Sequence, residues 1–207
     1  MPTIETSSGL QTIITSCFHY QFHWMGDHWK QEIVSVGGCQ AIPKIWSIEG
    51  LISHDAGLRP ASPAYQRLII EQDPADVIVA HLDGQSGSHH YAASFRFEEQ
   101  PEGVVVAVEV EDRCADADQP LTATYLIESS AGHLIQGEAA TITWPHPEAR
   151  LVFEAEPPAV VEANEAGMGT IRLRALAGPD LGADVHTLRY RWSWITVPAN
   201  QIWNRDI

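Results

Sequence analysis

Alternation of apolar and polar residues is the feature that most limits the folds open to this chain. From residue 67 onward, the sequence breaks into short segments in which every second residue is apolar. Side chains of a β-strand point alternately to its two faces, so this pattern predicts strands with one buried face. One example is the row Tyr91, Ala93, Phe95 and Phe97, which opposes the more polar row His90, Ala92, Ser94, Arg96 and Glu98.

Turn residues separate these segments, as at Asp83-Gly84, Ala131-Gly132 and Gly178-Pro179. The predicted strands are 67–72, 76–83, 89–98, 103–111, 121–128, 137–144, 150–156, 169–177 and 187–196. Short strands at this spacing are typical of antiparallel all-β proteins. The sequence therefore predicts an all-β fold of about eleven antiparallel strands. A two-sheet sandwich and a calycin-like barrel both remain open, because each buries one face of every strand.

The densest group of aromatic and histidine residues lies in residues 18–29. Residues 10–24 are expected to form a long strand, Met25-Gly26-Asp27 a turn, and residues 28–36 the return strand. Alternation sends the aromatic residues of 18–24 to one face and His19, Gln21 and His23 to the other. The aromatic face is expected to form a wall of the core, and the other face a polar surface.

The whole chain, residues 1–207, is expected to form a single β domain, because no internal repeat or change of composition marks a boundary. Residues 1–9 are small and polar and are expected to be a loose lead-in. Residues 39–66, which contain three prolines, are expected to form an irregular crossover or a lid.

Composition limits the partners of the chain. It has 27 acidic and 12 basic residues, a formal net charge of -15. This charge repels phosphate backbones and anionic lipids, so neither nucleic acid nor a membrane is an expected partner. Three widely spaced cysteines, and no basic segment before an apolar run at the N-terminus, favour a cytoplasmic protein with free thiols. No phosphate-binding loop is present, and no cofactor is expected.

Five histidines are candidate ligand-binding groups: His19, His23, His28, His89 and His90. His19 and His23 share a strand face but lie about 13 Å apart, which is too far to share one metal ion. His89 and His90 are adjacent and therefore point to opposite faces. No CxxC, HExxH or same-face HxH occurs, so no metal site is predicted. The favoured interpretation is half-buried sheet residues with hydrogen-bond partners. The alternative is an acid–base or metal site, in which another histidine comes close to His23.

Four arginines are the second candidate group: Arg172, Arg174, Arg189 and Arg191. Each pair shares one strand face, and the two strands are expected to form one hairpin. Cross-strand pairing with carboxylates such as Glu154 and Glu156 is the favoured interpretation. The alternatives are an anion site built from guanidinium groups and a contact between copies of the chain.

Two further stretches carry polar groups without a complete motif. Residues 111–118 have the carboxylates of a calcium loop but lack its central glycine and terminal glutamate. Residues 86–90 place serines beside histidines, with Asp83 or Asp55 to orient an imidazole, but they contain no nucleophile elbow. Neither stretch predicts a particular reaction.

The sequence therefore favours a non-enzymatic β domain that binds a small molecule or a protein. One alternative is an enzyme with an acid–base or metal site at the histidine-rich N-terminal hairpin. A second alternative is a structural or assembly protein that uses the arginine hairpin as an interface, which would make it a homo-oligomer.

Overall fold

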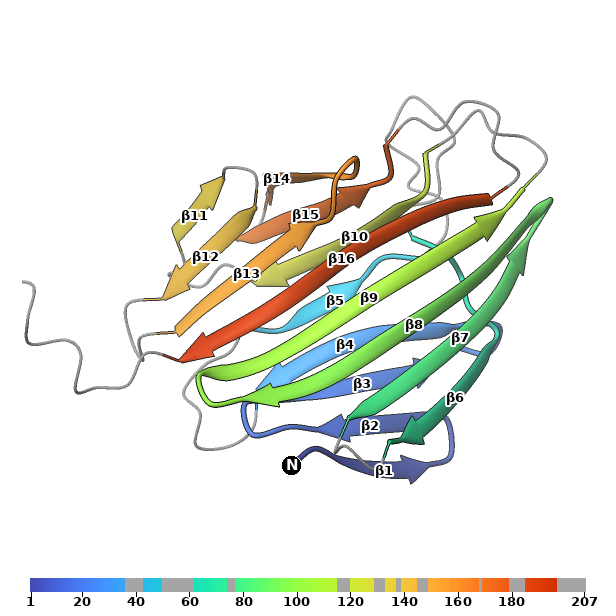
Figure 1. Cartoon of the computed structure of the whole chain (residues 1–207), viewed down its shortest axis with the longest axis horizontal. Coiled ribbons are helices and arrows are strands. Elements are labelled where there is room, and N and C mark those ends of the chain that lie inside the picture. Colours follow the sequence, from blue (N-terminus) through green and yellow to red (C-terminus); the bar gives the residue numbers. More distant parts are fainter. Residues whose placement is uncertain are drawn as a thin grey trace, which may run out of the picture.

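A computed structural model shows a sandwich of two antiparallel β-sheets (Figure 1). The structure describes residues 1–35, 43–49, 62–73, 77–114, 120–128, 133–136, 139–144, 149–167, 169–178 and 185–196. Each sheet has eight strands, so the count exceeds the prediction of about eleven. Within the described residues neither sheet closes on itself, so the sandwich, and not the barrel, is the fold adopted. The described residues contain no helix long and apolar enough to cross a membrane.

The first sheet has the order β1-β2-β3-β4-β5-β10-β15-β14. Its strands are β1 (Thr3–Ser7), β2 (Leu10–Ile14), β3 (Phe18–Trp24), β4 (Trp29–Ser35), β5 (Ile45–Ser47), β10 (Thr122–Glu128), β15 (Thr170–Leu176) and β14 (Val160–Gly167). The predicted turn between β3 and β4 is confirmed, and Gly26 has the positive φ of 106° that favours glycine there.

The second sheet has the order β11-β12-β13-β16-β9-β8-β7-β6. Its strands are β11 (His133–Gln136), β12 (Ala140–Trp144), β13 (Ala149–Ala155), β16 (Val185–Thr196), β9 (Gly103–Arg113), β8 (His89–Gln100), β7 (Ile78–Ser86) and β6 (Arg67–Gln72). The longest strands, β8, β9 and β16, lie side by side in its middle, with β8 and β16 running opposite to β9 (Figure 1).

Two predictions for the N-terminal region are wrong. Residues 1–9 are not a loose lead-in, because β1 pairs with β2 over its whole length. Residues 10–24 are not one strand, because a turn at Thr15–Cys17 separates β2 from β3. The Thr15 hydroxyl accepts hydrogen bonds from the backbone N–H groups of Cys17 and Phe18 at 3.3 and 3.0 Å. A threonine side chain that bonds to the backbone in this way competes with strand pairing.

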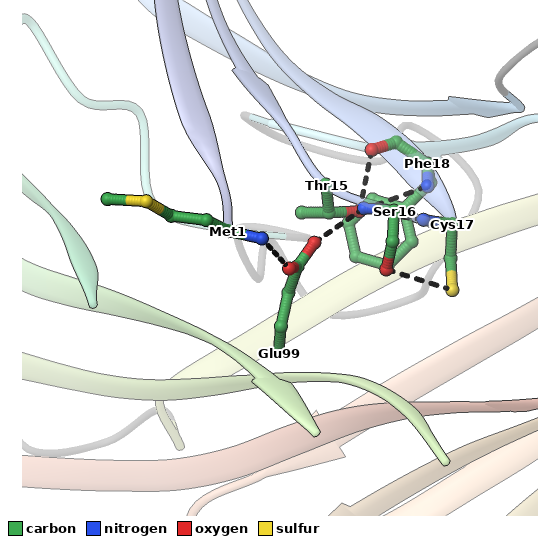
Figure 2. Close-up of polar contacts among 6 residues, drawn as sticks. All are labelled: Met1, Thr15, Ser16, Cys17, Phe18 and Glu99. Carbon is green, nitrogen blue, oxygen red and sulfur yellow. Dashed lines mark hydrogen bonds and ion pairs between the residues drawn. The ribbon is translucent and has the colours of Figure 1, made fainter. Parts of the chain in front are cut away.

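Glu99 at the end of β8 ties this turn to the second sheet (Figure 2). Its carboxylate accepts a hydrogen bond from the Ser16 backbone N–H at 2.6 Å and forms an ion pair with the Met1 ammonium group. Burial alone would raise the pKa of Glu99, but these two donors lower it below its ordinary value. The contact therefore joins the start of the first sheet to the second sheet.

Aromatic side chains from both sheets fill the space between them. The predicted inward face of β3 is confirmed for Phe18, Tyr20 and Phe22, which are buried, but not for Trp24 at the end of the strand, which is 39% exposed. The Tyr20 ring contacts Phe97 of β8 across the sandwich, with 5.0 Å between ring centres. Farther along, Tyr125 contacts Trp192 of the second sheet at 4.9 Å. These contacts join the sheets into one core.

A polar group lies in the middle of this core. The Gln31 side-chain oxygen accepts hydrogen bonds from the hydroxyls of Tyr20 and Tyr125, at 2.8 and 2.9 Å. The hydroxyls of Tyr125 and Tyr190 are 2.7 Å apart. Because Tyr125 donates its one proton to Gln31, Tyr190 donates to Tyr125. Burial raises the pKa of all three tyrosines. The network thus links the first sheet to the second through neutral phenols.

Residues 62–66 run between the two sheets, and Gly84 packs against them. Gly84 lies within β7, so the turn predicted at Asp83-Gly84 is wrong. Tyr65 in this segment is buried, and its carbonyl accepts a hydrogen bond from the Trp29 N–H at 2.8 Å. A Cβ atom on Gly84 would lie 2.1 Å from the Ala64 carbonyl oxygen and 2.8 Å from Tyr65 Cα. Residues 39–42 and 50–61 of the predicted crossover or lid lie outside the described residues. Residues 45–47 of that stretch are not irregular, because they form β5 between β4 and β10.

We expect Gly84→Ala to lower the free energy of unfolding by about 2 kcal/mol, because backbone atoms must move to admit one methyl group. Urea unfolding followed by circular dichroism measures this change. Gly26→Ala is the matched control, because a Cβ there meets no atom within 4 Å and suffers only the strain of a positive φ. A loss at Gly84 no greater than the loss at Gly26 would contradict the packing argument.

Candidate functional site

A group of polar side chains lies on the inner face at one end of the second sheet. At this end β8 and β16 begin and β9 ends, at the upper right of Figure 1. The pairing of β8 with β9 places Tyr91 opposite Asp112, and the pairing of β16 with β9 places His186 opposite Asp112 as well. His89 and Cys114 lie two residues from Tyr91 and Asp112, so they share the same face. Three neighbouring strands therefore supply these side chains.

Three of these residues form a connected series. The His89 Nδ1 atom lies 2.7 Å from Asp112 Oδ2, and the His89 Nε2 atom lies 3.7 Å from the Cys114 sulfur. The Ser88 hydroxyl lies 3.5 Å from the same sulfur. A carboxylate that accepts from Nδ1 orients the imidazole and leaves Nε2 free to accept a proton. We name Asp112, His89 and Cys114 the thiol–imidazole group.

Several polar atoms in and around this group are buried. Asp112 is 3% exposed, and its Oδ1 atom has no hydrogen-bond partner among the described residues. The Nε2 atom of His186 is also buried and unpaired within that part of the chain. Burial raises the pKa of Tyr91, and the nearby Asp112 and Cys114 raise it further. Asp112, His89 and Tyr91 also line a small cavity of about 10 Å³, about the room that one water molecule needs.

The structure does not bring the N-terminal histidines together into a site. His19 and His23 are half-buried on the outward face of β3, and the His23 Nε2 atom lies 3.1 Å from the Gln21 side chain. The His28 Nδ1 atom lies 2.6 Å from Asp27. His90 is exposed on the face of β8 opposite to His89. Among the described residues, no three histidine, cysteine or acidic side chains lie close enough to hold a metal ion.

The prediction that the four arginines lie on one hairpin is wrong. Arg172 and Arg174 lie on β15 in the first sheet, whereas Arg189 and Arg191 lie on β16 in the second sheet. The two strands follow one another along the chain, but the chain changes sheets between them. A sandwich permits such a crossing, and the alternation pattern does not report it.

Carboxylates pair with three of the four arginines, and Glu154 is one of them, as predicted. The fourth, Arg172, has a buried Nε atom without a hydrogen-bond partner among the described residues. Arg191 forms an ion pair with Glu154 of the adjacent strand β13, and Arg189 pairs with Glu109 of β9 at 2.6 Å. In the first sheet, Arg174 lies 3.8 Å from Glu162 of β14. Exposed pairs of this kind contribute little to stability.

A groove of about 840 Å³ crosses the outer face of the second sheet. Side chains from β8, β9, β16 and β13 line it, and Ala107 lies exposed on β9 within it. Its charged lining residues are Arg96, Arg189, Arg191, Glu98, Glu109, Glu154 and Glu156. The groove is thus nearly balanced in charge, although the chain as a whole carries a net charge of -15.

Sequence reasoning missed Asp112 and Cys114 as partners of His89, and it missed His186, which lies opposite Asp112. The sequence places Asp112 and Cys114 in residues 111–118, the stretch with the carboxylates of a calcium loop. In the structure, β9 continues to Arg113 and sends Glu111 and Asp112 to opposite faces. That part of the stretch is therefore not a loop, and residues 115–119 lie outside the described residues. The signal that could have found Asp112 is the alternation of residues 103–111. Continued to residue 113, this alternation places Asp112 on the buried face of the strand.

The sequence matches no model of a protein family and no curated protein. Among solved structures, the chain is similar to the crystal structure of 4-alpha-glucanotransferase from Thermococcus litoralis. The TM-score is 0.48 and the sequence identity 10%, over 95% of this chain and 39% of that chain. The chain therefore spans about two fifths of the length of that protein.

Proposed function

We propose that the chain is a non-enzymatic binding domain and that the outer groove of the second sheet is its binding surface. The observation that supports this most is the size and lining of the groove. Its volume of about 840 Å³ lies within the usual range of small-molecule sites. Strands in the middle of the sheet line it, so its floor is rigid.

The chemistry of the lining favours a small polar ligand or a peptide segment that carries both charges. Three arginines and four glutamates line the groove, and they already form exposed pairs with one another. Exposed pairs are worth at most about 1 kcal/mol, so a ligand exchanges them at little cost. Guanidinium and carboxylate groups side by side offer donors and acceptors together. A strongly anionic ligand would meet more carboxylates than guanidinium groups.

Nuclear magnetic resonance titration tests this proposal with three probes: the zwitterionic peptide Gly-Gly-Gly, sucrose and citrate. We expect the peptide or the sugar to cause saturable shifts at the amides of Ser94, Ala107 and Arg191 at millimolar concentration. Citrate should cause none there. The absence of saturable shifts at these amides with both the peptide and the sugar would contradict the proposal.

We expect Ala107→Trp to weaken this binding by roughly tenfold or more. The indole would fill the groove, so the ligand would lose its contacts with the groove floor. Ala107 is exposed, so the larger side chain does not enter the core. Ala92→Trp is the matched control, since Ala92 is also exposed on the middle strands but does not line the groove. Equal weakening by the two variants would argue against the groove as the binding surface.

A further inference from the structure

The thiol–imidazole group lies on the inner face of the second sheet and is separate from the outer groove. We propose that Cys114 is a nucleophilic thiol that small hydroperoxides oxidise, with His89 as its base and Asp112 as the group that orients His89. Two distances support these roles. Asp112 Oδ2 lies 2.7 Å from His89 Nδ1, and His89 Nε2 lies 3.7 Å from the Cys114 sulfur. A nucleophile, a base and an oriented carboxylate in series are the arrangement that activates thiols.

Access selects small reactants. Cys114 is 5% exposed, yet its sulfur lies 3.5 Å from the hydroxyl of Ser88, which is exposed, and 3.7 Å from Nε2 of His89, which is half-buried. The His89 side chain is 24% exposed, so solvent reaches the imidazole beside the sulfur. A nearly buried sulfur favours a small reactant such as hydrogen peroxide, which is little larger than water, over a bulky acyl substrate.

A second observation points to a small polar guest at this place. The Asp112 Oδ1 and His186 Nε2 atoms are buried without a partner among the described residues, and they belong to residues directly opposite one another in the sheet. Buried polar groups normally have a hydrogen-bond partner. Asp112 also lines the cavity of about 10 Å³, which has room for one water-sized molecule. A water-sized molecule that donates a hydrogen bond, such as water or hydrogen peroxide, would satisfy Asp112 Oδ1 from this cavity.

Hydrogen peroxide oxidises Cys114 in a single displacement at oxygen. The Cys114 thiol gives its proton to His89 Nε2, and the thiolate attacks one oxygen of hydrogen peroxide. The S–O bond forms as the O–O bond breaks, and the departing hydroxide takes the proton from His89 Nε2 and leaves as water. The thiol becomes a sulfenic acid, and the peroxide is reduced. Asp112 holds the imidazole in place throughout by accepting a hydrogen bond from Nδ1–H.

Mass spectrometry with the sulfenic-acid trap dimedone tests the proposal on the full chain treated with hydrogen peroxide. We expect Cys114 to react roughly tenfold faster than Cys17 at neutral pH. Cys17 is a matched internal control, because it is buried to a similar extent, at 6% exposed, with its sulfur 3.7 Å from the Ser16 hydroxyl. Equal rates at Cys114 and Cys17 in the folded protein would overturn the proposal.

His89→Gln gives the second measurement, since it keeps a polar side chain of similar size but removes the base. We expect the Cys114 rate to fall roughly tenfold and to rise with pH more steeply than in the native protein, because hydroxide must then remove the proton. Circular dichroism confirms that the variant is folded. If the variant does not fold, the pH dependence of the Cys114 rate in the native protein tests whether His89 is the base. A rate at Cys114 that rises as steeply with pH as the rate at Cys17 would refute the role of His89.

Discussion

Raising the pH of the folded protein should produce almost no tyrosinate until the whole fold is lost in one steep transition. The chain has five tyrosines. Burial raises the pKa of every one, namely Tyr20, Tyr65, Tyr91, Tyr125 and Tyr190. In an unfolded chain these phenols lose their protons near pH 10. The folded state therefore retains five protons in a pH range where the unfolded state has released them.

The sign of the effect follows from proton binding. Above pH 10 the unfolded state binds fewer protons than the folded state, so the free energy of unfolding falls as the pH rises. Stability is full below the unfolded-state pKa and is lost as the pH rises toward the folded-state values. Each tyrosine lowers the free energy of unfolding by about 1.4 kcal/mol per pH unit, and the five together lower it by about 7 kcal/mol per pH unit. Because small folds are stable by only about 5–15 kcal/mol, we expect unfolding within about two units above pH 10.

Near-ultraviolet absorbance of tyrosinate and far-ultraviolet circular dichroism, recorded on the same samples, measure this transition. The two signals should change together, and in concentrated guanidinium chloride all five phenols should titrate near pH 10. Tyr65→Phe removes one of the five and should make the alkaline transition about a fifth less steep. Tyrosinate that forms near pH 10 while the circular dichroism stays unchanged would contradict the burial of these phenols.

The pattern of one buried face was predictable wherever a strand alternates without interruption. The row Tyr91, Ala93, Phe95 and Phe97 of β8 is buried as expected. The break at Thr15 was not predicted, because its hydroxyl replaces strand pairing with a local hydrogen bond and leaves the alternation almost intact. β14 was not predicted either, since it lies at the edge of its sheet and its pattern is largely exposed.

The candidate site was less predictable, because it depends on which strands are neighbours. His89 was singled out from the sequence, but its partner Asp112 lies 23 residues away and faces it only through the pairing of β8 with β9. The arginine strands show the opposite error, since neighbours along the chain proved to lie in different sheets. Alternation reports the face of a residue and carries no information on the order of strands.

Gln31→Leu should lower the free energy of unfolding by about 3 kcal/mol, although it replaces a polar residue with an apolar one of similar size inside an apolar core. Gln31 is 3% exposed on β4, and its side-chain oxygen is the acceptor for both Tyr20 and Tyr125. Leucine accepts no hydrogen bond, so two buried hydroxyls lose a partner, at about 1–3 kcal/mol each. Urea unfolding at neutral pH measures the change.

A second substitution separates the lost hydrogen bonds from the altered packing. In Gln31→Leu with Tyr20→Phe, one of the two unpaired hydroxyls is removed, so about half of the lost stability should return. Tyr125 is not the residue to change, because its oxygen also accepts the proton of Tyr190. Gln21→Leu is the matched control on neighbouring β3, where the glutamine is half-buried and its side-chain oxygen lies 3.1 Å from His23 Nε2. It should change the stability by less than about 1 kcal/mol. If the double variant is no more stable than Gln31→Leu, packing rather than the phenol network explains the loss.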